Sequence, residues 1–201
     1  LRELRRVNNA LICHPIPPSP TFSYSSMRFK AKAAPITVGY LGAMVDHKGW
    51  PVFVRLINRF GGAGIRFVVL SDRSANVGED ASSKVHVTTD TPDAMSRAVR
   101  DAKVDVVLHW ASWAETFSFT TFEAMLGGAW VLTNPVSGNV QASVLSSGRG
   151  AVLEDEAALV AFFADGGLEN LVAERRAYAD RTEILAQDSN MTFDLSGWCK
   201  A

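Results

Sequence analysis

The sequence has little of the features that mark several special classes of protein. Its 201 residues include only two cysteines, Cys13 and Cys199, which lie near opposite ends without metal-ligand spacing, so a reduced, cytoplasmic setting is expected. No run reaches the ~18 consecutive apolar residues that a membrane-spanning helix needs, and no signal peptide is visible. Neither sign of charge is in excess, with 20 Lys and Arg against 21 Asp and Glu, so nucleic acid and membrane contacts are not indicated.

Two common catalytic motifs are missing as well. The sequence contains neither the Gly-x-Ser-x-Gly turn of serine hydrolases nor a Walker glycine loop, so these two chemistries are not expected. What it does contain is a composition of 47% hydrophobic and 20% charged residues, which is typical of an ordered globular domain.

Proline is concentrated near the start of the chain. Four prolines fall within residues 15–20 and a Ser-rich stretch follows, a composition that excludes a helix or a central strand. We therefore predict three parts: a Pro/Ser-rich N-terminal segment or linker at residues 1–35, a Rossmann-like domain at residues 36–167, and a C-terminal helix and tail at residues 168–201.

From Ile36 onward, short β-rich runs alternate with segments of helical spacing. Strands are predicted at residues 36–41, 65–70, 84–88, 104–108, 129–133 and 150–153. Helices are predicted at residues 51–60, 91–102, 117–127, 138–147, 155–163 and 168–187. This alternation predicts an α/β fold with a Rossmann-like parallel sheet and helices on both faces. Ligands in such sheets bind beyond the carboxyl ends of the strands, so the segments that follow the strands are the candidate site.

One of these segments carries two glutamates eight residues apart. Glu115 precedes a predicted helix and Glu123 lies inside it. Eight helical residues rise by about 12 Å, so the two carboxylates can meet the two ends of an elongated polar ligand. The helix N-terminus between them, with its amide groups and positive dipole, suits a diphosphate. The spacing alone arises often by chance, and its weight comes from the strand before it and the strand behind it.

The layout of residues 36–163 resembles the C-terminal, donor-binding domain of retaining GT-B glycosyltransferases, which transfer sugars from nucleotide-sugars. That family's Glu-x7-Glu motif is followed by Ala-Met and a glycine, as here. The sequence from Trp113 to Ser118 is similar to that of the family members that build bacterial surface polysaccharides. The matching residues are Ser112, Glu115, Glu123, Ala124, Met125 and Gly128, the first strand Gly39-Tyr40-Leu41-Gly42 with the turn Lys48-Gly49, and the closing segment with Gly138, Gly148 and Gly150.

The resemblance implies a role for each matching position. Glu115 would bind the hydroxyls of the donor sugar and Glu123 those of the ribose, while Lys48 would neutralise the leaving diphosphate, so Lys48 and Glu115 are the expected catalytic residues. Backbone groups would complete donor binding: the amides of Phe117, Ser118 and Phe119 at the phosphate nearest the sugar, and Val87 and Thr88 at the base. The resemblance implies no metal and no other cofactor, because the nucleotide-diphosphate sugar is itself the donor substrate.

Two positions depart from the family pattern. Ala43 stands where the family usually has an arginine, which removes half of the cationic pair on the phosphates, and Arg73 or Arg149 is the candidate replacement. Ser118 stands in place of a glycine, a mild change because a serine amide still donates. His109, which ends a predicted strand, is interpreted as a structural residue.

The function implied by the resemblance is the nucleotide-sugar half of a cytoplasmic glycosyltransferase in polysaccharide biosynthesis. Its partners would be the donor, a glycan or lipid-linked acceptor, and an N-terminal Rossmann-like domain that the sequence lacks, so the chain alone is expected to be inactive. One alternative, favoured by Ala43, is a degenerate, non-catalytic nucleotide-sugar-binding or interaction module of a larger multidomain protein. Another is a different GT-B enzyme, such as a sugar-nucleotide epimerase.

Overall fold

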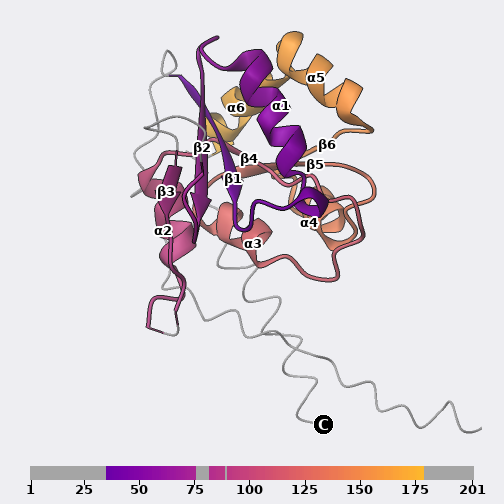
Figure 1. Ribbon diagram of the computed structural model, residues 1–201. Coiled ribbons are helices and arrows are strands. Elements are labelled where there is room, and N and C mark those ends of the chain that lie inside the picture. Colours follow the sequence, from indigo (N-terminus) through magenta and orange to yellow (C-terminus); the bar gives the residue numbers. More distant parts are fainter. Residues whose placement is uncertain (1–34, 76–81, 89, 179–201) are drawn as a thin grey trace, which may run out of the picture.

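A computed structural model describes residues 35–75, 82–88 and 90–178 (Figure 1). Nearly all of the predicted N-terminal segment, and the part of the predicted last helix beyond residue 178, lie outside the described residues. Within them, six parallel strands form one sheet in the order β3-β2-β1-β4-β5-β6. The strands are β1 (Ile36–Leu41), β2 (Ile65–Ser71), β3 (Ser82–Lys84), β4 (Val106–Leu108), β5 (Trp130–Thr133) and β6 (Gly150–Val152).

Helices cover both faces of this sheet. Those helices are α1 (Trp50–Phe60), α2 (Ala94–Asp101), α3 (Phe119–Leu126), α4 (Asn139–Ser147), α5 (Glu156–Ala164) and α6 (Gly167–Tyr178), and a single 3-10 turn, η3 (Asp46–Lys48), precedes α1. Side chains of α1, α5 and α6 pack on one face and those of α2, α3 and α4 on the other. The predicted α/β fold, a Rossmann-like parallel sheet with helices on both faces, is confirmed.

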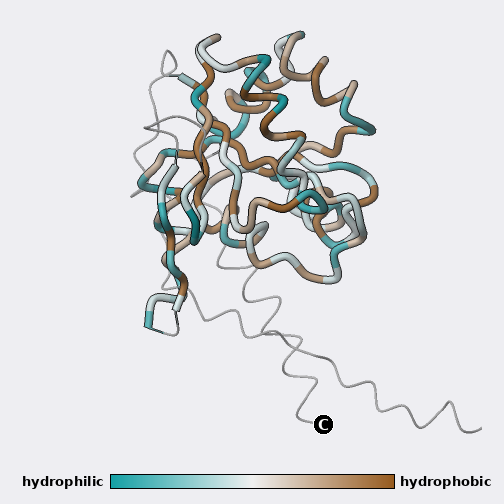
Figure 2. Tube along the Cα trace, viewed as in Figure 1, coloured by the Kyte–Doolittle hydropathy of each residue, from teal (hydrophilic) through white to brown (hydrophobic). Residues whose placement is uncertain are grey.

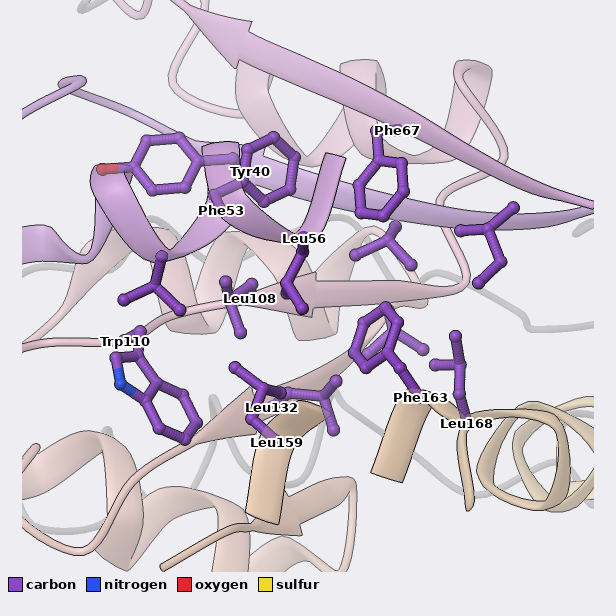
Figure 3. Packing of buried hydrophobic residues seen from close by; sticks show 14 of the residues in the cluster. Tyr40, Phe53, Leu56, Phe67, Leu108, Trp110, Leu132, Leu159, Phe163 and Leu168 are labelled. Carbon is purple, nitrogen blue, oxygen red and sulfur yellow. The ribbon is translucent and has the colours of Figure 1, made fainter. Parts of the chain in front are cut away.

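The core lies in two layers because side chains alternate along each strand. Val106 and Leu108 of β4 face α1, α5 and α6, whereas Val107 between them faces the other helices. Figure 2 shows hydrophobic residues along the central strands. Figure 3 shows the first layer, in which Phe53 of α1 and Phe163 of α5 lie over the sheet. Burying both faces explains why the central strands read as continuous apolar runs.

The topology contains a switch point between β1 and β4. The chain runs outward from β1 to β3, returns to β4 beside β1, and then runs outward again to β6. Ligands of open α/β sheets bind outside the carboxyl ends of the strands at such a point. The side at which the strands end is called the carboxyl edge (residues 42–49, 71–75, 109–118 and 134–138), and the opposite side the amino edge (residues 64, 104–105, 128–129 and 148–149).

The third strand differs from its prediction. It spans Ser82–Lys84 and pairs with the last three residues of β2, whereas the sequence predicted a strand at residues 84–88. The ladder stops because β2 ends at Ser71, whose carbonyl accepts the final hydrogen bond, over 2.7 Å, from Val85 N. Beyond that point the chain has no strand to pair with, despite its β-branched residues.

Local chemistry sets the helix starts. Gly49, with a φ of 84°, precedes α1, and Pro51 occupies its first turn. The side chain of Ser118 accepts a hydrogen bond from Thr121 N, which places the start of α3 at Phe119, two residues later than predicted. Among the described residues, no helix combines the length and the apolar character required to span a bilayer.

Candidate functional site

Three loops at the carboxyl edge are joined by backbone hydrogen bonds. Ser112 N, in the loop after β4, donates to His47 O in the loop after β1 over 3.0 Å. Glu115 N donates to Ser137 O over 3.2 Å, and Asn139 N donates to Glu115 O over 2.8 Å. The loop after β4 is therefore held between the loops after β1 and β5. This arrangement fixes the backbone of Glu115 relative to both neighbouring strands.

Lys48 lies in a turn that packs closely against the loop after β4. The residue after it, Gly49, packs so tightly that a Cβ there would lie 2.4 Å from Trp110 O, and its φ of 84° also favours glycine. Lys48 forms no ion pair with any other described residue. Its ammonium group is therefore available to an anion that binds at the switch point.

The carboxylate of Glu115 is oriented by its neighbours. Its Oε1 accepts a hydrogen bond from Trp113 Nε1 over 3.1 Å. The Trp113 side chain is 52% exposed and packs on the ring of His47, with 4.4 Å between the ring centroids. These contacts use one oxygen of Glu115 and hold the other in place for a polar ligand.

The N-terminus of α3 lies at the same edge. Ser118 Oγ accepts a hydrogen bond from the backbone amide of Thr121. The backbone amides of Ser118 and Thr120 have no acceptor among the described residues. Phe117 and Phe119 flank the cap, and their rings pack edge to face. The predicted amide positions 117–119 therefore surround the helix start. The amide of Thr120 is a further hydrogen-bond donor that the sequence analysis did not name, because the position of the cap decides which amides remain unpaired.

Glu123 lies in the second turn of α3. Burial raises its pKa to about 6. Its carboxylate makes no hydrogen bond with any described residue. A partly buried carboxylate without a partner is unusual in a purely structural role, because desolvation disfavours its charged form.

His109, which the sequence analysis interprets as a structural residue, lies beside the start of α3. It is 6% exposed, and its Nδ1 lies 3.4 Å from Thr121 Oγ1 and 3.5 Å from Ser118 Oγ. Burial lowers its pKa to about 4; the charge of Glu115 opposes this effect and that of Lys48 adds to it. His109 therefore belongs with Glu115, Lys48 and the start of α3. The available signal was a polar residue at the end of an apolar run beside the switch point.

Other predicted residues lie elsewhere. Val87 and Thr88 follow β3, which β2 separates from β1, and Thr88 Oγ1 is hydrogen-bonded locally to Thr91 Oγ1 over 2.9 Å. Arg149 is buried at the amino edge just before β6, so it does not supply the cation missing at Ala43. Arg73 follows β2 at the carboxyl edge and is exposed.

A pocket of about 510 Å³ opens beside this group on the α1 side. Gly49, Trp110 and Ser112 line it, together with residues 134–136 and 154–156, whereas Lys48 and Glu115 do not. The described residues contain no cluster of three His, Cys, Asp or Glu side chains able to hold a metal ion. The described groups offer hydrogen bonding, the dipole at the start of α3 and the charged side chains of Lys48, Glu115 and Glu123.

No protein-family model matches the chain, and no curated protein sequence matches it. Solved structures do resemble it. A GtfA/B complex is 13% identical with a TM-score of 0.51, and the match covers 88% of this chain and 38% of that one.

Two further structures are similar at lower scores. Alr3699/HepE from Anabaena, in complex with UDP and glucose, is 14% identical with a TM-score of 0.49, covering 82% of this chain and 48% of that one. WaaG, a glycosyltransferase involved in lipopolysaccharide biosynthesis, is 15% identical with a TM-score of 0.48, covering 80% and 47%. The chain thus spans about half the length of these two structures. At such identities the likeness concerns the fold, and it agrees with a Rossmann-like parallel sheet.

Proposed function

We propose that this chain is the nucleotide-sugar-binding half of a retaining GT-B glycosyltransferase. The observation that carries the proposal is the convergence of Lys48, Glu115 and the N-terminus of α3 at the β1/β4 switch point. This is the place in the fold where a nucleotide ligand is expected, and the groups there have hydrogen-bonding and charge capacity that the other described residues do not use.

Each group has a defined task in the proposed site. The start of α3, with its positive dipole and the amides of Ser118 and Thr120, receives the diphosphate. Lys48 stabilises the negative charge that develops on the diphosphate when the bond from the sugar breaks. Glu115 accepts hydrogen bonds from the sugar hydroxyls, and Glu123, in the second turn of α3, accepts those of the ribose.

The acceptor side requires a second domain in this proposal. The described residues form one Rossmann-like layer, and the groups above account for the donor alone. A glycan or a lipid-linked glycan would be held by an N-terminal Rossmann-like domain facing the carboxyl edge. We therefore expect the chain by itself to bind the donor with little or no sugar transfer. Val87 and Thr88 would contact the base of a nucleotide that extends as far as β3.

A non-catalytic binding module is the second candidate, and one observation favours it. Ala43 leaves the loop after β1 without a second cation, and Arg149 is buried at the opposite edge. Lys48 would then be the single lysine or arginine that the loop after β1 brings to the diphosphate. Binding would survive this loss better than catalysis, because catalysis depends on charge stabilisation in the transition state.

Ligand-observed NMR of the chain tests the proposal with UDP, GDP, ADP and dTDP, each with and without attached glucose. We expect one nucleotide to bind selectively with a Kd of roughly millimolar, or about −4 kcal/mol. Glu123→Gln should abolish that binding, and the matched exposed control on α6, Glu169→Gln, should not. A folded chain that binds no nucleotide, or equal binding by Glu123→Gln and the parent chain, would contradict the proposal.

Slow hydrolysis of the bound nucleotide-sugar separates the two candidates. A glycosyltransferase half is expected to release nucleoside diphosphate at a low rate that falls at least tenfold in Lys48→Ala, since the lysine acts on the leaving group. A binding module releases none above the uncatalysed rate, with or without Lys48.

A further inference from the structure

The side chain of His109 has one satisfied and one unsatisfied nitrogen. Nδ1 faces the first turn of α3, 3.5 Å from Ser118 Oγ and 3.4 Å from Thr121 Oγ1. Nε2, at the other side of the ring, is buried and has no hydrogen-bond partner among the described residues. Most buried polar atoms in folded proteins have a partner, so this nitrogen marks a place that another molecule completes.

The ring is held in one orientation. It is 6% exposed, and the two hydroxyls on α3 lie on its Nδ1 side. Ser118 Oγ is itself the cap of α3 and accepts a hydrogen bond from Thr121 N, so the imidazole contacts the residue that fixes the start of the helix. A hydrogen-bonding group that is fixed before the ligand arrives loses little conformational entropy on binding.

The groups around His109 favour an uncharged polar partner for Nε2. Burial lowers the pKa of the imidazole to about 4 and so keeps it neutral. The charge of Glu115, in the same loop, raises this pKa, whereas the charge of Lys48, in the loop after β1, lowers it. The groups facing the imidazole from α3 are the uncharged hydroxyls of Ser118 and Thr121. A neutral imidazole is not a counter-ion for phosphate, and it matches an uncharged hydroxyl that can donate or accept one hydrogen bond.

We infer that His109 Nε2 hydrogen-bonds a hydroxyl of the sugar portion of the bound nucleotide-sugar, beside Glu115, and so is a specificity-determining residue. This inference rests on the proposed function, and it adds a second polar contact to the sugar, from the residue that directly follows β4. The phosphates are left to Lys48 and the amides of α3. His109 therefore contributes to the difference in affinity between a nucleotide-sugar and the corresponding nucleoside diphosphate.

Two substitutions separate the two ring nitrogens. His109→Gln places a polar atom near the position of Nε2, whereas His109→Asn places one only near the position of Nδ1. Each variant is titrated with UDP, GDP, ADP and dTDP and with their glucose derivatives. We expect His109→Asn to weaken binding of the glucose derivative roughly three- to tenfold, as for the loss of one neutral hydrogen bond, with unchanged affinity for the diphosphate, and His109→Gln to recover part of the loss.

A measurement on the unsubstituted chain avoids any dependence on the folding of the variants. The ¹⁵N resonance of His109 Nε2 is expected to shift when the glucose derivative is added and to stay in place when the diphosphate alone is added. Equal weakening of both ligands by His109→Asn, or an Nε2 resonance that the glucose derivative does not move, would overturn the inference while leaving nucleotide binding intact. If the chain binds no nucleotide at all, the proposed function fails, and the inference fails with it.

Discussion

Asp105 at the amino edge and His109 at the carboxyl edge are both buried polar side chains, but their surroundings differ. At the amino edge, Asp105 is 2% exposed, and its Oδ1 lies 2.9 Å from Arg175 Nη1. Its Oδ2 accepts a hydrogen bond from Thr37 N over 2.9 Å, and Arg175 Nε donates to Gly128 O over 2.7 Å. At the carboxyl edge, His109 Nε2 has no hydrogen-bond partner among the described residues, and Lys48 has no ion pair with any of them. The carboxylate of Glu123, in the second turn of α3, has no hydrogen-bond partner among them either.

The difference separates groups that serve the fold from groups that are open to a ligand. The ion pair at the amino edge joins α6 to the start of β4, and its geometry satisfies both charges. The same type of chemistry at the carboxyl edge is left incomplete, although desolvation without a partner costs free energy. Such a cost is expected where a ligand completes a site, and burial also perturbs the pKa values of His109, at this edge, and of Glu123, in the second turn of α3.

Asp105→Ala breaks the paired edge and should have the largest effect. It leaves Arg175 buried without its charge partner, so we expect a loss of about 3–5 kcal/mol in the free energy of unfolding, measured by urea denaturation. Asp101→Ala, at an exposed position on α2, is the control and should change little. A loss below about 1 kcal/mol for Asp105→Ala would mean that the pair does not hold α6 to the domain.

Acid should weaken the fold through His109. Its folded pKa of about 4 lies below the ordinary value of 6.5, so the unfolded chain binds the proton more readily between these values. His109 therefore contributes nothing to pH dependence above pH 6.5, and up to about 3 kcal/mol of stability is lost as the pH falls from 6.5 to 4. His109→Asn should lack this component when unfolding is measured across the range. Parallel curves for the two proteins would exclude a buried neutral imidazole.

Gly49→Ala tests the close approach that positions Lys48. The new Cβ would meet Trp110 O, so we expect a loss of about 2–3 kcal/mol and at least tenfold weaker nucleotide binding. Gly62→Ala is a matched control, because Gly62 has a φ of 83° but open space around its Cβ position. It should show only the backbone cost of about 1 kcal/mol and normal binding. Equal effects of the two substitutions would show that the contact with Trp110 is unimportant.

Glu123→Gln should stabilise the protein slightly while it removes binding. The folded pKa of about 6 is above the ordinary value of 4.5, so the charged carboxylate costs up to about 2 kcal/mol above pH 6. That cost disappears as the pH falls from 6 to 4.5. Glu123→Gln should therefore be about 1–2 kcal/mol more stable than the parent chain at pH 8 and equal to it near pH 4, by thermal or urea unfolding. A less stable variant at pH 8 would indicate a structural role for the carboxylate.

Much of the fold could be predicted from residue patterns, because local chemistry and burial determine it. The apolar runs at residues 36–41 and 65–70 form the central strands, and the cap at Asp155, whose Oδ1 accepts from Ala158 N over 2.8 Å, starts α5 as expected. The third strand was misplaced because its bounds depend on where β2 ends. Of the site, the helix start between Glu115 and Glu123 was predicted, whereas the unsatisfied nitrogen of His109 was not.

The sequence by itself determined the order of strands and helices, and hence that the segments before α1 and α3 meet at the carboxyl edge of a parallel sheet. Only the tertiary structure decided which polar groups are paired. Asp105 finds Arg175 seventy positions away, and Arg149 is placed on the far side from Ala43. The physical reason is that pairing depends on contacts between segments distant in the chain, whereas helix caps, turns and burial periodicity depend on neighbours a few residues apart.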